Sequence, residues 1–152
     1  MSILISYSLA DAPFALKIGN DLQQRGVNLL VDRWDIPFHE PWTNWQQRLI
    51  AEADAFLVVM SPDYIASTYC QAEWGLLTTT EVRSFVVVAR QLFHEDWLTE
   101  NLERGYLDFS DSSEPSYQTN LQQLIAQIRL HLPSAIGTPL SEPAQLVLEN
   151  LY

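Results

Sequence analysis

Short apolar runs alternate along the chain with longer stretches in which apolar residues recur at helical spacing. Four of these runs cover residues 3–8, 27–32, 55–60 and 84–89, and a shorter one covers residues 106–109. They are rich in Val, Ile and Leu and end at polar residues, a pattern typical of buried parallel strands. The helical spacing between them predicts helices over residues 11–25, 42–53, 67–80 and 121–132, and a short helix within residues 93–104.

The alternation of strands and helices predicts an α/β domain. Because connections between parallel strands are right-handed, we expect a flavodoxin-like, doubly wound, five-stranded parallel sheet flanked by helices. Asp11 is the expected N-cap of the first helix, and Gly26 is the expected end of that helix. We assign residues 1–132 to this one domain. Residues 133–152 contain three Pro and one Gly and are interpreted as a linker or docking tail that leads to a partner or sensor domain.

Composition narrows the classes of partner. The chain has 152 residues and a formal net charge of −11, from 8 Lys+Arg against 19 Asp+Glu, so we expect no nucleic-acid contact. Four arginines, Arg25, Arg33, Arg48 and Arg90, are candidates for binding a small phosphate ester. The single cysteine, Cys70, excludes an internal disulfide. With no signal peptide and no apolar stretch of membrane-spanning length, we expect a cytoplasmic protein that does not contact a membrane.

The candidate chemistry is concentrated after the third strand, in residues 61–74. Ligands of open α/β sheets bind outside the carboxyl ends of the strands, so a site is expected here. If Ser67 caps the next helix, Tyr69 and Glu73 project from one helical face because they are four residues apart. An aromatic plane beside a carboxylate can hold a flat cationic ring next to a sugar.

Four segments, in order and at matching spacing, resemble the TIR (Toll/interleukin receptor) domain family. They are residues 3–8 with Asp11, residues 31–35 followed by Trp42, residues 56–64 with Ser67, Tyr69, Cys70 and Glu73, and residues 106–109. The resemblance covers approximately residues 1–132 and is strongest to TIR domains of the bacterial type. It implies one of two activities, which are cleavage of NAD at the nicotinamide–ribose bond and non-catalytic association with other TIR domains.

The resemblance also implies a catalytic residue. In the NAD-cleaving members a glutamate follows a Trp-Cys pair, and Glu73 occupies the place of that glutamate. Tyr69 and Cys70 occupy the place of the pair, with Tyr instead of Trp. Nicotinamide leaves as a neutral molecule from a cationic ring, and a carboxylate can stabilise the oxocarbenium-like ribose that remains. This chemistry requires no cofactor and no metal ion, and the three histidines are scattered along the sequence.

Each site residue has a structural interpretation beside the functional one. Glu73 is either the catalytic carboxylate or a solvated helix residue, and Tyr69 either stacks on the ligand or packs in the core. Ser67 is a helix cap as well as a candidate substrate contact. The other candidate substrate contacts lie at the ends of the first two strands and in the loop after them, and they are Ser6, Ser8, Asp32, Trp34 and Phe38. Asp32 is alternatively a turn residue, and Trp34 and Phe38 alternatively contact a neighbouring subunit. Cys70 is expected to be a small buried apolar residue.

The leading interpretation is an NAD⁺ nucleosidase that hydrolyses or cyclises its substrate to an ADP-ribose product and acts in bacterial antiphage immunity. In the resembled family the loop after the second strand reaches a neighbouring molecule, so activation by head-to-tail self-association is expected. That loop carries Trp34, Ile36 and Phe38, and it has Pro37 and no glycine. The alternative is a non-catalytic TIR adaptor, and a nucleoside-processing enzyme of flavodoxin-like fold is a more distant one.

Overall fold

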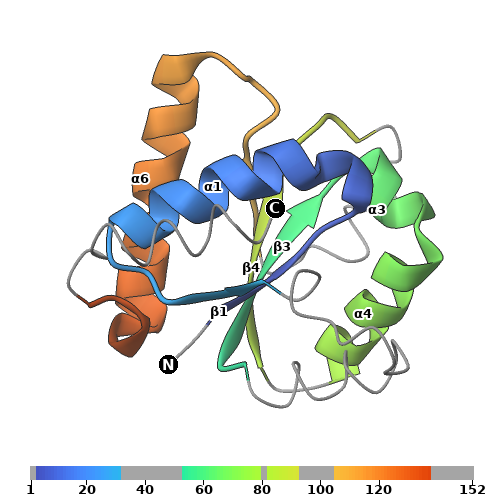
Figure 1. The fold of residues 1–152 in the computed structure, drawn as a ribbon, viewed down its shortest axis with the longest axis horizontal. Helices are drawn as coiled ribbons and strands as arrows, with labels where there is room; N and C mark the ends of the chain where they lie inside the picture. The colour runs from blue at the N-terminus through green and yellow to red at the C-terminus, as the bar shows by residue number, and fades with distance from the viewer. Residues whose placement is uncertain (1–2, 32–52, 80–81, 93–104, 138–152) are drawn as a thin grey trace.

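The computed structural model describes residues 3–31, 53–79, 82–92 and 105–137 (Figure 1). Its strands are β1 (Ile3–Ser6), β2 (Leu29–Val31), β3 (Ala55–Met60), β4 (Arg83–Val88) and β5 (Leu107–Asp108). Its α-helices are α1 (Ala12–Gln24), α3 (Pro62–Ala66), α4 (Thr68–Thr79) and α6 (Glu114–His131). Two 3₁₀ turns, η1 (Leu9–Asp11) and η2 (Pro133–Ala135), precede α1 and follow α6.

All strand pairs in the sheet are parallel, and the strand order is β2-β1-β3-β4-β5. This is the flavodoxin-like order that the alternation of strands and helices predicted. β3 matches the predicted run of residues 55–60 and pairs along its whole length with β4. β5 is shorter than the predicted run of residues 106–109, because only Leu107 and Asp108 pair with β4.

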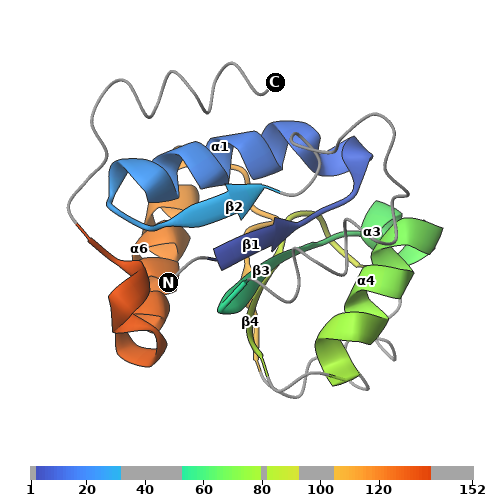
Figure 2. The same ribbon diagram turned by 60° about the horizontal axis from the view of Figure 1, so that its bottom comes forward.

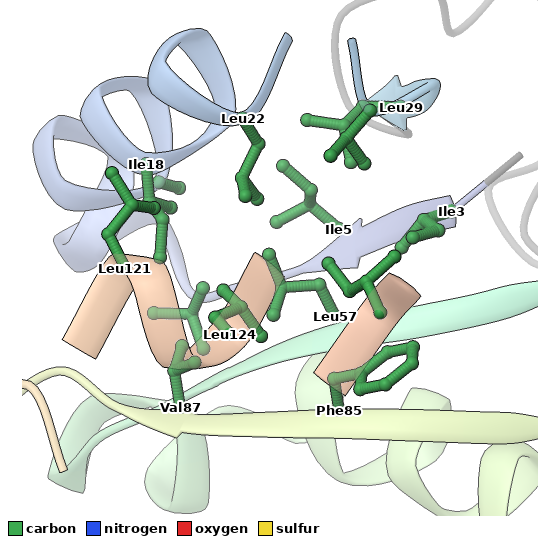
Figure 3. Close-up of a cluster of buried hydrophobic side chains, with 14 of the residues drawn as sticks. Ile3, Ile5, Ile18, Leu22, Leu29, Leu57, Phe85, Val87, Leu121 and Leu124 are labelled. Carbon is green, nitrogen blue, oxygen red and sulfur yellow. The ribbon is translucent and has the colours of Figure 1, made fainter. Parts of the chain in front are cut away.

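Side chains of the strands alternate between two apolar cores, as the period of a strand requires. One core joins alternate residues of β1, β3 and β4 to α1 and α6, and Figure 3 shows its side chains converging between these helices and the sheet. The other core joins the intervening strand residues, such as Leu4, Phe56 and Val86, to Tyr64 of α3 and to Cys70 and Leu77 of α4. The sheet is therefore covered on both faces, with α1 and α6 on one side and α3 and α4 on the other (Figure 2).

The packed body continues beyond Leu132, where we expected the linker to begin. Ala135 is buried in the α1/α6 core, and its carbonyl accepts a 2.9 Å hydrogen bond from the amide of Asn28. Ile136 forms an antiparallel bridge with Val27, beside the turn at Gly26. Residues 133–137 thus belong to the domain. No helix among the described residues is long and apolar enough to cross a bilayer.

The predicted helix over residues 42–53 lies outside the described residues except for Ala53, and the predicted helix within residues 93–104 lies wholly outside them. The predicted site residues Asp32, Trp34 and Phe38 lie outside them too. The side chain of Tyr69 is likewise not described, although its backbone forms part of α4.

Candidate functional site

Polar side chains gather where β1, β3 and β4 end. Ser8 and Asp11 follow β1, Ser61 and Asp63 follow β3, and Arg90 follows β4. Since the three strands are parallel, their carboxyl ends share one edge of the sheet, and Figure 1 shows the start of α1 beside α3 at this edge. We refer to these five residues as the strand-end cluster.

Asp11 is the centre of the strand-end cluster. Its side chain is only 3% exposed, and its carboxylate accepts hydrogen bonds from three side chains. Ser8 Oγ donates to Oδ2 at 2.6 Å, Ser61 Oγ donates to the same oxygen, and Arg90 Nε donates to Oδ1 at 2.9 Å. A buried carboxylate is costly unless it is paired and hydrogen-bonded, and these donors meet that requirement. Asp11 stands at the N-cap of α1, as predicted, but its side chain makes no capping hydrogen bond.

Arg90 joins Asp11 to α3. Its side chain is 48% exposed, and its Nη2 also donates to Asp63 Oδ2. The hydrogen bonds to Asp11 and Asp63 raise the pKa of Arg90, so the guanidinium stays charged. Among the basic candidates from the sequence, Arg90 is the one that the structure places at this edge, because Arg25 bonds instead to Asp21 and Gln118. Arg33 and Arg48 lie outside the described residues.

A second polar contact links β1 to α3. The hydroxyls of Ser6 and Tyr64 lie 2.8 Å apart, and both side chains are buried. Ser6 and Ser8 were predicted to contact substrate, and the structure shows both hydroxyls bonded to protein groups at the expected edge of the sheet. Their contact with a ligand stays a prediction.

Ser67 begins α4, as the sequence predicted. Its Oγ accepts from the amide of Cys70 at 3.2 Å, and its carbonyl accepts from the amide of Gln71 at 2.9 Å. This cap sets the helical register of Cys70, Glu73 and Leu77, which are three and four residues apart and are all buried. Cys70 is thus a buried apolar residue, as expected.

Glu73 is fully buried, with 0% of its surface exposed. The interpretation of Glu73 as a solvated helix carboxylate is therefore wrong. Its neighbours on the same helical face, Cys70 and Leu77, belong to the α3/α4 core, so the carboxylate is turned towards the sheet. Glutamate is rarely buried completely unless other groups interact with it, and such positions are often functional.

Sequence reasoning missed the roles of Asp11, Ser61 and Tyr64 at this edge. From the sequence, Asp11 is expected to be a helix cap, and Ser61 is expected to be the polar residue at the end of a strand. One signal was available: all three residues follow strands that had been predicted to lie side by side and parallel. Their partners are distant in sequence, so no local pattern identified the contacts.

A pocket of about 250 Å³ lies elsewhere, beside the amino-terminal half of β4. Val86, Leu107 and Leu124 contribute apolar surface, and Arg83, Gln127 and His131 are among its polar lining residues. Within the described ranges no group of three or more His, Cys, Asp or Glu side chains could hold a metal ion.

The family model of the TIR domain matches residues 3–125. No curated protein sequence matches the chain. The solved structures that share its fold include two TIR domains from other proteins. The TIR domain of the Toll-related receptor TRR-2 from Hydra magnipapillata is 20% identical, with a TM-score of 0.69, over 84% of this chain and 97% of that one. The TIR domains of the activated Roq1 resistosome, which recognizes the pathogen effector XopQ, are 15% identical, with a TM-score of 0.54, over 99% of this chain and 82% of that one.

Proposed function

Because this chain belongs to the TIR domain family, which contains both NAD-cleaving enzymes and non-catalytic adaptors, we propose that it cleaves NAD⁺ between nicotinamide and ribose. The observation that carries the proposal is the complete burial of Glu73 on the face of α4 that packs against the sheet. An adaptor needs no carboxylate at such a position, where an apolar residue would avoid the cost of desolvation. An enzyme that stabilises a cationic intermediate does need one.

The proposed roles follow from the charge that develops during cleavage. As the nicotinamide–ribose bond breaks, its electron pair moves to the ring nitrogen and positive charge grows on the ribose. The carboxylate of Glu73 stabilises that charge and binds the ribose hydroxyls. Tyr69 stacks on the nicotinamide, while Ser6, Ser8, Ser67, Asp32, Trp34 and Phe38 complete the substrate site. Water, or the adenine ring in a cyclisation, then attacks the ribose.

We further propose that activity depends on head-to-tail assembly. TIR domains self-associate, and in this chain the loop after β2 carries the large apolar residues Trp34, Ile36 and Phe38. The pocket beside β4 has apolar surface from Val86, Leu107 and Leu124, which suits an apolar loop of a second copy. Contacts between two different surfaces repeat from one molecule to the next and so lead to filaments. Depletion of NAD⁺ by such an assembly is the proposed route to antiphage defence.

The decisive experiment is chromatography of NAD⁺ incubated with concentrated protein, with release of nicotinamide as the readout. We expect the parent to release nicotinamide and Glu73→Gln to release none, because the substitution keeps the shape and removes the charge. Glu114→Gln is the matched control, since it makes the same change at an exposed carboxylate of α6. Cleavage by Glu73→Gln at the rate of the parent would remove the catalytic assignment, and a parent without activity at any concentration would favour the adaptor.

Glu73→Gln also needs a stability measurement, because its site is in the core. A change to Gln would cost little stability at a solvated helix position, but Glu73 is fully buried. Since Gln keeps the volume and can still form hydrogen bonds, we expect the unfolding free energy to change by no more than about 2 kcal/mol. Loss of activity in a folded variant then reports on chemistry.

A further inference from the structure

We propose that Asp11 and Arg90 are positioning residues, which hold α3 and α4 on the sheet and so fix the place of the Glu73 carboxylate. The consequence for catalysis rests on the function proposed above. The consequence for the position of α4 does not, and it is tested separately below.

The hydroxyl of Ser61 links α3 to the end of β1. Ser61 Oγ accepts a hydrogen bond from the amide of Tyr64 at 3.1 Å, which caps α3, and it donates its own proton to Asp11 Oδ2. One side chain thus starts the helix and ties it to η1 at the end of β1. The Ser6–Tyr64 contact adds a second tie between β1 and the same helix.

Arg90 provides a further tie to α3. Its guanidinium bonds to Asp11 through Nε and to Asp63, in the first turn of α3, through Nη2. α3 has only five residues, too few for a helix to be stable by its own hydrogen bonds. Its orientation therefore depends on these contacts with the ends of β1 and β4.

The orientation of α3 is transmitted to α4 through a short, bonded junction. The amide of Ser67 donates to the carbonyl of Tyr64 at 3.3 Å, and Ser67 then caps α4. The side-chain amide of Gln71, in the first turn of α4, donates to the carbonyl of Ile65 in α3 at 2.6 Å. A rotation of α3 would consequently carry the start of α4, and Glu73 with it.

α4 also has few apolar anchors of its own. Its buried residues in the described structure are Cys70, Glu73 and Leu77, whereas α6 buries five, Tyr117, Leu121, Leu124, Ile125 and Ile128. Among its described side chains, α4 buries one carboxylate and two apolar residues, and Trp74 and Leu76 are only partly buried against the same core, so its apolar burial is less complete than that of α6. Polar contacts at the strand ends compensate for that weaker packing.

Cys70 offers a readout that does not depend on activity. It is the only cysteine of the chain, it is fully buried, and it lies one helical turn before Glu73. Its reaction with a thiol reagent under native conditions requires α4 to open from the sheet. We expect labelling to become at least about tenfold faster in Asp11→Asn and Arg90→Gln, because each variant removes donors or acceptors that hold α3.

Two controls separate this effect from general loss of stability. Lys17→Gln removes the exposed ion pair between Lys17 and Glu114, which includes no residue of the strand-end cluster. Ile128→Val removes one buried methyl group from the opposite core. In both variants, the reagent should label Cys70 at a rate within about twofold of the parent rate. The rate of global unfolding is measured in parallel, and its contribution to the labelling is subtracted.

The kinetic consequence is a loss in kcat with little change in KM, because a displaced carboxylate weakens stabilisation of the transition state more than substrate binding. Arg90→Lys should recover part of the loss, since a single ammonium can bond to one of the two carboxylates. Arg90 is half exposed, so the Arg90→Gln variant is expected to fold even if Asp11→Asn does not.

The outcomes separate the inference from the proposed function. Unchanged Cys70 labelling and unchanged kcat in Arg90→Gln would overturn the positioning role, even if Glu73→Gln is inactive. An inactive parent would end the enzymatic proposal, while faster labelling in Arg90→Gln would still support the positioning role.

Discussion

The buried contact between Ser6 and Tyr64 permits a quantitative test of the site architecture. Each hydroxyl lies in the interior, and the two oxygens are 2.8 Å apart. Ser6→Ala leaves the Tyr64 hydroxyl without this bond, and Tyr64→Phe does the same to Ser6. Each loss should cost about 1–3 kcal/mol, because a buried polar group loses a partner that water cannot replace.

The double variant should cost less than the sum of the single ones. Removal of both hydroxyls leaves neither group of the pair unsatisfied, so we expect a coupling free energy of about 1–2 kcal/mol. For a chain of this length, a single-variant loss of about 2 kcal/mol corresponds to a fall in Tm of roughly 4–8 °C.

The assay is urea unfolding of the four proteins, followed by tryptophan fluorescence, with the slope m checked for constancy. Additive losses, with a coupling below about 0.5 kcal/mol, would refute the inferred hydrogen bond. KM for NAD⁺, measured on the same proteins, tests the predicted ligand role of Ser6. A direct contact raises KM in Ser6→Ala and leaves Tyr64→Phe near the parent value.

Three further predictions concern the ligand, the pH dependence and the assembly. Tyr69→Ala should lower NAD⁺ turnover and Tyr69→Trp should preserve or raise it, and equal rates would show that the ring does not stack on substrate. Burial raises the pKa of Tyr117 above its usual 10.0, and the hydrogen bond to Asp21 raises it further. The contribution of the protonated hydroxyl to the unfolding free energy is therefore complete below about pH 10 and declines above it. Melting curves between about pH 9.5 and 11 should therefore fall less steeply for Tyr117→Phe, and equal slopes would contradict the assignment. Specific activity should rise with protein concentration, and Phe38→Asp should suppress that rise while circular dichroism shows an intact fold; constant activity on dilution would mean that one chain holds a complete site.

Much of the fold could be predicted because its signals are local. The run Ala55–Met60 is apolar throughout and is bounded by Asp54 and Ser61, so the limits of β3 were visible in the sequence. Ser67 was identified as a cap by its residue type and its position before an apolar helical pattern, and the structure confirms the cap. The strand order followed from the alternation of elements and the handedness of their connections.

The parts that could not be predicted depend on long-range contacts. Asp11 was correctly placed at a helix start, but its carboxylate bonds to Ser61 and Arg90, which are 50 and 79 residues away in sequence. The burial of Glu73 has the same origin, since isolated helix propensity gives no reason to turn a carboxylate towards a sheet. The continuation of the domain through residues 133–137 was missed because the contacts of Ala135 with Asn28 and of Ile136 with Val27 have no sequence pattern.

The division into two cores has a consequence for synthesis of the chain on the ribosome. The described residues of the core that contains Cys70 run from Leu4 to Leu92, whereas the opposite core includes Ile128 and Ala135. At usual rates of translation, the residues between Leu92 and Ile128 take about 2–7 s to be added. The half of the domain that carries Glu73 can therefore begin to pack while the other face of the sheet still lacks its α6 cover. During that interval the nascent chain exposes apolar strand residues, and they are the part of the protein that a chaperone would recognise.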